Sequence, residues 1–228
     1  LPGGPMQGGP VFDGRASDLT SLSEGCGMVK AGLIDEKTLD ALEDTCGPGC
    51  GSCSFFGTAN TMCCLSEALG MTLPGGALIP AVYAERTRMA FATGEKIVDL
   101  VRENLTSDKI ITEKGIDNAI RVLNATGGST NGVLHLLAIA KEAGIDSPIV
   151  MEKFKKSAMA TPIVAKVNPA SKYNMEDFYF SGGIPQVMKE LETMLETDAL
   201  TVTGKTVGEN LAQWQWLNVN RDVIKTVE

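Results

Sequence analysis

Apolar residues recur at helical spacing along much of the chain, and they predict a mostly helical protein. Two helices are expected over residues 18–33 and 35–45, and Asp35 is placed to cap the start of the second. A further helix is expected over residues 58–69, where apolar side chains lie three and four residues apart. Gly70 can end this helix, because glycine tolerates the left-handed backbone that follows many helices.

The middle of the chain carries the longest helical pattern. Residues 79–104 predict one long helix, or two helices interrupted at Gly94. Residues 107–126 predict a helix with Thr112 as its N-cap. A glycine turn then leads into an amphipathic helix within residues 127–145.

Two apolar segments, residues 160–167 and 200–204, predict short buried strands. Helices are expected beside them over residues 182–194 and 206–213. Short apolar strands among more numerous helices are typical of layered α/β proteins. The predicted fold class is therefore α/β, with helices packed on a short parallel sheet.

Composition and charge exclude two classes of partner. The 228 residues are 43% hydrophobic and 21% charged, which suffices for a sizeable core. The net charge of −8 argues against nonspecific binding to nucleic acid or to an acidic membrane, since both need basic patches. The sequence shows no signal peptide. No apolar run approaches the length of about 20 residues that a membrane helix needs, so we expect a cytoplasmic protein. The chain opens at Leu1 in a loop rich in glycine and proline, from which we expect a segment of a longer protein.

Five of the six cysteines fall within residues 46–64, and this clustering predicts metal or redox chemistry. They are Cys46, Cys50, Cys53, Cys63 and Cys64. The first three have the spacing C-x3-C-x2-C, with which three thiolates can hold an iron–sulfur cluster and leave one iron open. The same spacing occurs in radical S-adenosylmethionine enzymes, although Ser52 stands where those enzymes usually carry an aromatic residue.

A second interpretation takes only one ligand from this loop. Cys53 precedes the helix expected over residues 58–69, and N–H groups at a helix start stabilise a thiolate. Cys63 and Cys64 would lie roughly 15 Å further along, which is too far to share a metal and favours small core residues. A third interpretation is a structural or redox module of reduced cysteines. Zinc is not favoured, because His135 is the only histidine.

Several longer motifs are similar to one enzyme family. GSCSFFGTANTMCCLSEALGMTLPG (51–75) resembles the third cluster-cysteine motif of the dihydroxy-acid dehydratase and 6-phosphogluconate dehydratase family. The resemblance continues in NAIRVLNATGGSTNGVLHLLAIAKEAGID (118–146), FSGGIPQVMKEL (180–191) and VTGKTVGENL (202–211). The opening GGPMQGG (3–9) resembles the loop after the family's second cysteine motif. The similarity covers nearly the whole chain and is greatest to the dihydroxy-acid branch, while FFGTAN is also similar to the 6-phosphogluconate branch.

The resemblance implies a hydro-lyase that converts a 2,3-dihydroxy carboxylic acid to a 2-keto acid in branched-chain amino acid biosynthesis, or that dehydrates a sugar acid such as 6-phosphogluconate or an aldonate. It implies an iron–sulfur cluster, 2Fe–2S or 4Fe–4S, whose open iron is a Lewis acid for the leaving 3-hydroxyl. It also implies a Mg²⁺ that binds the carboxylate and 2-hydroxyl, and a serine alkoxide that takes the C2 proton. The implied partner is a small hydroxy-acid substrate, and the implied assembly is a homodimer or homotetramer.

Carried over residue by residue, the resemblance assigns Cys53 as the family's third cluster ligand. Cys46 and Cys50 match no ligand position. The other two ligand cysteines, the magnesium ligands and the catalytic serine are expected outside these residues, so no catalytic residue is assigned here. Residues 1–228 are thus expected to be a segment of the family's N-terminal domain that is inactive on its own.

The glycine turn at residues 127–130 has two interpretations. Its N–H groups could bind a carboxylate or phosphate, or Ser129 or Thr130 could simply cap the next helix. His135, further along that helix, is expected to be a satisfied, partly buried side chain rather than a catalytic base.

Two other groups of residues are assigned structural roles. Tyr83, Glu85 and Arg86 are expected to pair on one helix face. The TGKT string at residues 203–206 lacks the upstream glycine of a phosphate loop, so no nucleotide role is assigned to it.

Overall fold

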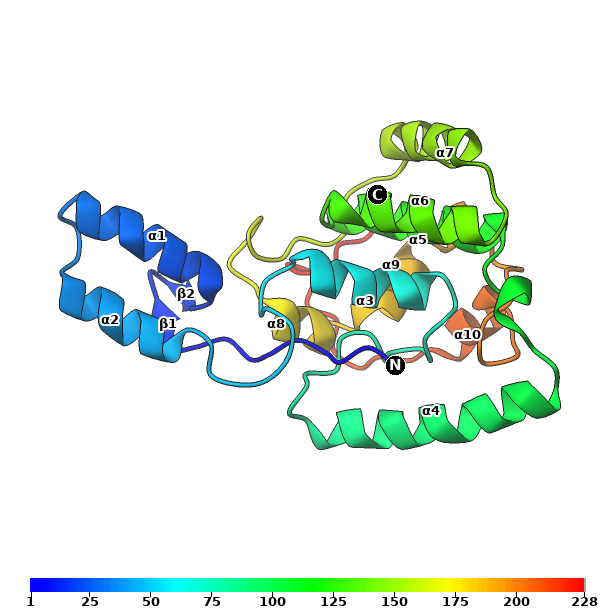
Figure 1. The fold of residues 1–228 in the computed structure, drawn as a ribbon, viewed down its shortest axis with the longest axis horizontal. Helices are drawn as coiled ribbons and strands as arrows, with labels where there is room; N and C mark the ends of the chain where they lie inside the picture. Colours follow the sequence, from blue (N-terminus) through cyan, green and yellow to red (C-terminus); the bar gives the residue numbers. More distant parts are fainter. Residues whose placement is uncertain (228) are drawn as a thin grey trace.

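Helices make up most of the fold in the computed structural model, which describes residues 1–227 (Figure 1). The first part of the chain contains the strands β1 (Val11–Phe12) and β2 (Arg15–Ala16) and the helices α1 (Leu19–Lys30), α2 (Glu36–Thr45) and α3 (Thr58–Ala68). The middle contains α4 (Ala84–Arg102), the 3₁₀ helix η1 (Ser107–Lys109), α5 (Glu113–Thr126), α6 (Asn131–Glu142) and α7 (Ser147–Ala160). The last part contains α8 (Met175–Phe180), α9 (Gly183–Glu190), the 3₁₀ helix η2 (Glu192–Met194) and α10 (Val207–Gln213). Within residues 1–227, no helix combines the length and the apolar character needed to cross a membrane.

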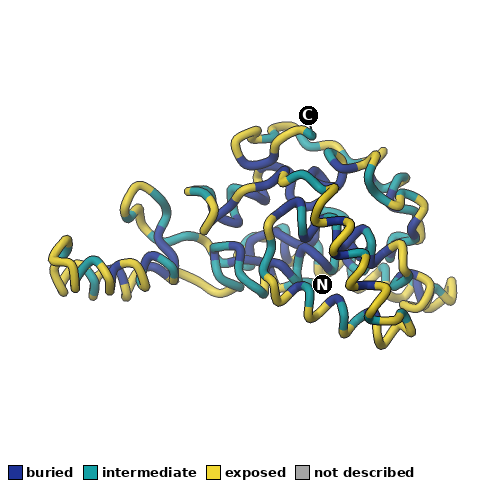
Figure 2. The backbone as a smooth tube through the Cα atoms, turned by 90° about the horizontal axis from the view of Figure 1, so that it is seen from above, coloured by how far each residue is buried: buried dark blue, intermediate teal, exposed yellow. Residues whose placement is uncertain are grey.

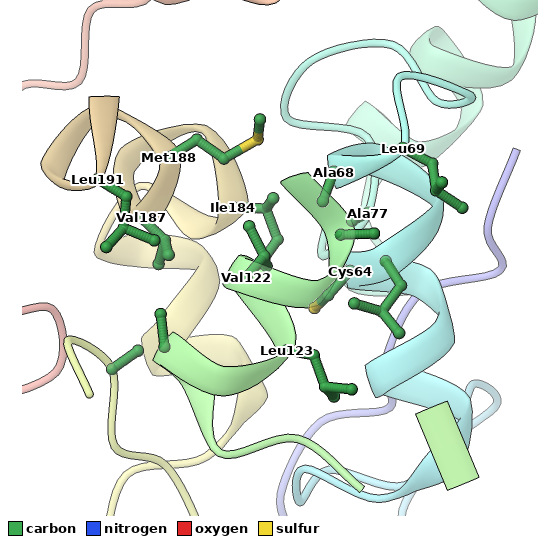
Figure 3. Packing of buried hydrophobic residues seen from close by; sticks show 14 of the residues in the cluster. Cys64, Ala68, Leu69, Ala77, Val122, Leu123, Ile184, Val187, Met188 and Leu191 are labelled. Atoms are coloured by element: carbon green, nitrogen blue, oxygen red, sulfur yellow. The ribbon is translucent and has the colours of Figure 1, made fainter. Parts of the chain in front are cut away.

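Helix α5 lies at the centre of the hydrophobic core. It packs against α3, α6, α7 and α9. Its inward face includes Ile116 and Ile120, which are almost completely buried. Figure 3 shows Val122 of α5 between Cys64 of α3 and Ile184 of α9. The core is therefore built by helices, and α3 is part of it.

Local capping interactions set several helix boundaries where the sequence predicts them. The Asp35 carboxylate accepts a hydrogen bond from Thr38 N at 2.8 Å at the start of α2. The Thr112 hydroxyl accepts one from Gly115 N at 3.4 Å at the start of α5. Gly127 follows α5 with φ of 61°, a left-handed conformation that glycine adopts without a steric penalty. Both predicted N-caps are confirmed.

Helices α1 and α2 form an arm that projects from the rest of the molecule (Figure 1). They pack chiefly on each other, and Figure 2 shows that much of the arm is exposed. A Cβ on Gly25 of α1 would come within 3.0 Å of Leu39 and 3.2 Å of Leu42 of α2, so glycine permits the close approach of the two helices. Beside the arm, β1 and β2 pair antiparallel with Val11 opposite Ala16.

Helix α4 continues through Gly94, which decides between the one-helix and two-helix predictions. It begins at Ala84, later than predicted, because the preceding residues form a turn in which Tyr83 N donates to Pro80 O at 3.1 Å. The helix runs along one edge of the fold (Figure 1), and Phe91 and Val101 on it are 71% and 76% exposed. Its position therefore leaves much of its apolar surface outside the core.

The predicted parallel sheet is wrong for residues 1–227, although the helix-rich character is confirmed. The described sheet is the antiparallel pair β1–β2. The predicted strand at residues 160–167 forms one isolated antiparallel bridge, between Ala165 and Ile224. The one at residues 200–204 likewise forms a single antiparallel bridge, between Leu200 and Thr206. The two segments pair with different partners, so no parallel ladder joins them.

Helices α7 and α8 are absent from the sequence prediction. Helix α7 begins after Asp146 with Pro148 in its first turn, a position that proline favours. Helix α8 begins at a capping box, in which the Asn174 side chain accepts from the N–H of Asp177 and the Asp177 carboxylate accepts from the N–H of Asn174. At six residues, α8 is too short to show a helical period clearly.

A conservative core substitution checks the central position of α5. Ile120→Val removes one methylene from a side chain that is 1% exposed, and we expect it to lower the free energy of unfolding by about 1 kcal/mol. The matched change Ile97→Val, on a side chain that is 55% exposed, should leave stability unchanged. Urea unfolding of both variants measures the difference, and equal effects would contradict the assigned core.

Candidate functional site

Cys53 lies in the loop between α2 and α3, where its side chain is half-buried. The loop is not helical, since α3 starts at Thr58 with Gly57 as its N-cap. The Cys53 backbone nevertheless contacts the first turn of α3, because the side-chain amide of Asn60 donates to Cys53 O. The thiol is thus carried by an irregular segment that a core helix holds in place.

Asn60 bonds to three points of this loop. Its Nδ2 donates to Cys53 O and, at 2.8 Å, to Phe55 O, and its Oδ1 accepts from Ser52 Oγ at 2.6 Å. The Asn60 side chain is completely buried, so water does not compete for these bonds. The backbone on both sides of Cys53 is therefore fixed relative to α3.

The glycine-rich start of the chain lies directly beside the cysteine loop. Met6 N donates to Ser52 O at 2.7 Å and Ser52 N donates to Gly4 O at 3.0 Å, which forms a parallel bridge. Gly51 has φ of 130°, and a Cβ there would come within 2.5 Å of Met6 N. Glycine is required at this position, because any side chain would separate the two segments.

Arg86 holds the same N-terminal segment from the other side. Its Nη1 donates to Pro2 O and to Gly76 O, each at 2.8 Å, and its Nη2 donates to Ile79 O. Burial lowers the pKa of the Arg86 guanidinium. The expected side-chain pairing with Tyr83 and Glu85 is not found: the Tyr83 hydroxyl donates to Glu176, and the Glu85 carboxylate accepts from Tyr179. The structural role expected for Arg86 is seen in its bonds to these three carbonyl groups.

The five clustered cysteines have different surroundings. Cys64 is buried in the core, as predicted, and burial raises the pKa of its thiol well above the usual value. Cys63 is half-buried and packs against the core, and burial raises its pKa as well. Cys46 is buried at the end of α2 with a raised pKa, whereas Cys50 is exposed. Burial thus disfavours the thiolate form at Cys46, Cys63 and Cys64.

No group of three or more His, Cys, Asp or Glu side chains within residues 1–227 lies close enough together to hold a metal ion. The structure therefore does not bring Cys46, Cys50 and Cys53 together as one ligand set. Cys53 stays the predicted single ligand, and its half-buried thiol leaves it within reach of a metal. The neighbouring Ser54 hydroxyl is buried and lacks a hydrogen-bond partner among the described residues, so the loop also retains an unused donor.

The starts of α3 and α6 meet in a second polar cluster. Asn131 Nδ2 donates to Thr58 Oγ1 at 2.8 Å, and Thr58 Oγ1 lies 3.2 Å from Ser129 Oγ. Ser129 N donates to Thr61 Oγ1 at 3.0 Å. Ser129 Oγ also accepts from Asn131 N at 3.3 Å, whereas Thr130 makes no side-chain cap. The N-cap of α6 is thus Thr130 without a side-chain cap, and Ser129 binds the first N–H of the helix from the residue before it. These contacts account for the polar residues of the GGSTN string.

The expectation of a partly buried His135 is wrong, because this side chain is exposed. Apolar residues surround His135 in the sequence on both sides, but they do not share one face of α6. Leu136 is completely buried, whereas Leu134 is 64% exposed. A helix with apolar residues all around its circumference does not reveal its buried face from sequence alone.

Comparison with known proteins gives one consistent result. The model of the dihydroxy-acid/6-phosphogluconate dehydratase N-terminal family matches residues 1–210. Proteins named dihydroxy-acid dehydratase from Caldanaerobacter subterraneus subsp. tengcongensis, Methanococcoides burtonii and Carboxydothermus hydrogenoformans are 49%, 47% and 46% identical over 228 residues. These alignments cover 99% of this chain but only 40%, 41% and 40% of the relatives, so the chain spans about two fifths of their length. The chain therefore belongs to the dihydroxy-acid/6-phosphogluconate dehydratase family and matches its N-terminal domain.

Proposed function

We propose that this chain is a segment of the N-terminal domain of a hydro-lyase that converts a 2,3-dihydroxy carboxylic acid to a 2-keto acid. The observation that carries the proposal is identity of 46–49% over the whole chain to proteins named dihydroxy-acid dehydratase. The corresponding pathway is branched-chain amino acid biosynthesis in the cytoplasm. The partner is a small hydroxy-acid substrate, and the assembly is a homodimer or homotetramer. With the family assigned, the radical S-adenosylmethionine and redox-module interpretations have no remaining support.

In this proposal Cys53 is one of three protein ligands of an iron–sulfur cluster, 2Fe–2S or 4Fe–4S. The half-buried thiol and its fixed loop support the assignment. When bound, the cluster supplies a Lewis acid for the leaving hydroxyl, and Mg²⁺ neutralises the substrate carboxylate. The remaining ligands, the magnesium ligands and the catalytic serine come from residues beyond this chain.

The contribution of this chain is to hold the Cys53 thiolate in position. Asn60 fixes the loop from α3, and Ser52 joins it to the Gly4–Met6 segment. Arg86 fixes that segment to the turn before α4 through Pro2 and Ile79. The three interactions restrain the loop from different directions, so the thiol needs little rearrangement on binding iron.

A sugar-acid dehydratase is the second candidate, because the matching family model also covers 6-phosphogluconate dehydratases. Kinetics of the full-length protein with 2,3-dihydroxyisovalerate, 6-phosphogluconate and an aldonate separate the two functions. We expect the highest kcat/KM for the branched dihydroxy acid. A preference for either sugar acid would transfer the assignment to the second candidate.

The isolated 228-residue chain should neither bind a stoichiometric cluster nor dehydrate a dihydroxy acid. It supplies one assigned thiolate, and a single ligand does not retain a cluster against exchange with solvent thiols. Iron and sulfide analysis after anaerobic reconstitution, followed by a keto-acid assay, tests this expectation. The full-length protein under the same treatment is the control. A stoichiometric, active cluster in the isolated chain would show that its ligands are all present within residues 1–228.

A further inference from the structure

We propose that Asn60 is a positioning residue for the cluster, because its side-chain amide holds the backbone on both sides of Cys53 and so sets how the thiolate meets iron. The inference rests on the proposed function of Cys53 as a cluster ligand. Asn60 does not touch the cluster in this proposal. It acts through the main chain of the residue that does.

The hydrogen-bonding capacity of Asn60 is used on this one loop. The Nδ2 group has two hydrogens, and its two acceptors are Cys53 O and Phe55 O. The Oδ1 atom accepts from Ser52 Oγ at 2.6 Å. The bonded residues are thus Cys53 itself, the residue before it and the second residue after it. An amide that only capped α3 would bond to N–H groups of the helix instead.

Asparagine is the side chain that suits this position. Aspartate has the same shape but no donor, so its carboxylate would face the carbonyl oxygens of Cys53 and Phe55. Serine and threonine carry a single hydroxyl hydrogen, which cannot serve two carbonyl groups at once. The Asn60 side chain is completely buried, so a lost bond would not be replaced by bulk water.

Further hydrogen bonds hold the main chain of the loop and leave the Cys53 thiol unbonded. Phe56 N donates to Asn168 O at 2.8 Å, and Met175 N donates to Ser54 O at 2.9 Å. These bonds connect the far side of the loop to Asn168 and to the first residue of α8. No hydrogen bond to the Cys53 thiol is present among the described residues. The main chain is therefore fixed around a side chain that remains free to bind metal.

Asn118 offers a matched control. It is also completely buried, and its side chain makes the same kind of two-sided contact with a distant loop. Its Nδ2 donates to Glu196 O at 3.1 Å, and its Oδ1 accepts from Glu196 N at 2.8 Å. The loop at Glu196 carries no cysteine. Asn118→Asp therefore makes the same chemical change at a buried amide without acting on Cys53.

The test compares Asn60→Asp and Asn118→Asp in the full-length dehydratase that contains this segment. The readouts are iron and sulfide per chain after anaerobic purification, and the rate of cluster loss with EDTA, followed by visible absorbance. We expect Asn60→Asp to lose its cluster about 10- to 100-fold faster than wild type, the range seen when a residue that orients a metal ligand is replaced. Asn118→Asp should lose its cluster at the wild-type rate, even if its urea midpoint falls as much as that of Asn60→Asp.

Equal rates of loss in the two variants, or a wild-type rate in Asn60→Asp, would overturn the proposal. If Asn60→Asp does not fold, Ser52→Ala removes one bond of the same contact, and an unchanged rate of cluster loss in that variant would overturn it. The proposed function fails separately. If Cys53→Ser retains a full cluster, the ligand assignment itself is wrong, whereas loss in Cys53→Ser with a wild-type rate in Asn60→Asp removes only the positioning role.

Discussion

Cys53→Ser in the full-length protein is expected to remove the iron–sulfur cluster and abolish dehydration of the dihydroxy acid. A serine hydroxyl is far less acidic than a thiol, and it does not supply the soft thiolate that iron–sulfur clusters require. The loop itself should keep its shape, because the bonds from Asn60 reach backbone carbonyl groups and Ser52 rather than the thiol. Iron and sulfide content, visible absorbance and keto-acid formation measure the loss.

Cys46→Ser and Cys50→Ser are the matched controls for this result. Cys46 is buried at the end of α2, where burial raises the pKa of its thiol, and Cys50 is exposed on the loop. By resemblance to the family motif, neither occupies a cluster-ligand position. Both variants should therefore keep a stoichiometric cluster. Loss of the cluster in either one would restore the interpretation in which the C-x3-C-x2-C spacing supplies three ligands.

Glu67→Gln is expected to change how the stability of the fold depends on pH. Glu67 is a buried carboxyl group on α3, and its two oxygens accept hydrogen bonds from Gly75 N at 2.6 Å and Ala77 N at 2.8 Å. Burial raises the pKa of Glu67 from 4.5 to about 7, because desolvation of the charged form outweighs these two bonds and the nearby charge of Arg86. Folding therefore favours the protonated form of this side chain.

The direction of the effect follows from the raised pKa. The stabilisation that proton binding to Glu67 contributes is fully present below pH 4.5 and is lost as the pH rises to about 7. The change amounts to about 3 kcal/mol, since each pKa unit corresponds to about 1.4 kcal/mol. Glutamine does not titrate. Between pH 5 and pH 8 the free energy of unfolding of wild type should therefore fall, relative to that of Glu67→Gln, by up to this amount. Glu67→Gln also turns an amide donor toward Gly75 N or Ala77 N at every pH, so the comparison concerns the pH dependence and not the absolute stability.

Urea unfolding at several pH values measures this difference. Glu95→Gln provides the control, because Glu95 is an exposed residue of α4 and its replacement should leave the pH dependence as in wild type. Parallel pH profiles for wild type and Glu67→Gln would show that the buried carboxyl group keeps an ordinary pKa.

The starts of α2 and α5 were predictable because their signals are local, whereas α7 and α8 were missed. Asp35 and Thr112 cap their helices through bonds to residues three positions away, which the sequence displays directly. The parallel sheet was not predictable in the same way. The segment around Ala165 pairs with Ile224, and the segment around Leu200 pairs with Thr206, and nothing in a short apolar run specifies its partner.

The same distinction applies to the candidate site. Motif similarity predicts Cys53 as the candidate ligand, because the string around it is long and specific. The role of Asn60 could not be predicted, and for Arg86 the sequence predicts a structural role but not its partners. Both bind backbone carbonyl groups, and a carbonyl group is present at every residue. The available signal was indirect: a polar residue at the third position of a helix that otherwise packs in the core. Only the three-dimensional structure shows that this residue turns back to the loop before the helix.

The arm formed by α1 and α2 is expected to unfold more easily than the core of the molecule. Its helices pack chiefly on each other, so it can open while α3, α5 and α9 keep the contacts that determine global unfolding. The cysteine loop connects these two regions. The bonds from Ser52 to Gly4 and Asn60 lie between the arm and Cys53, so we expect the thiol to keep its position when the arm opens locally.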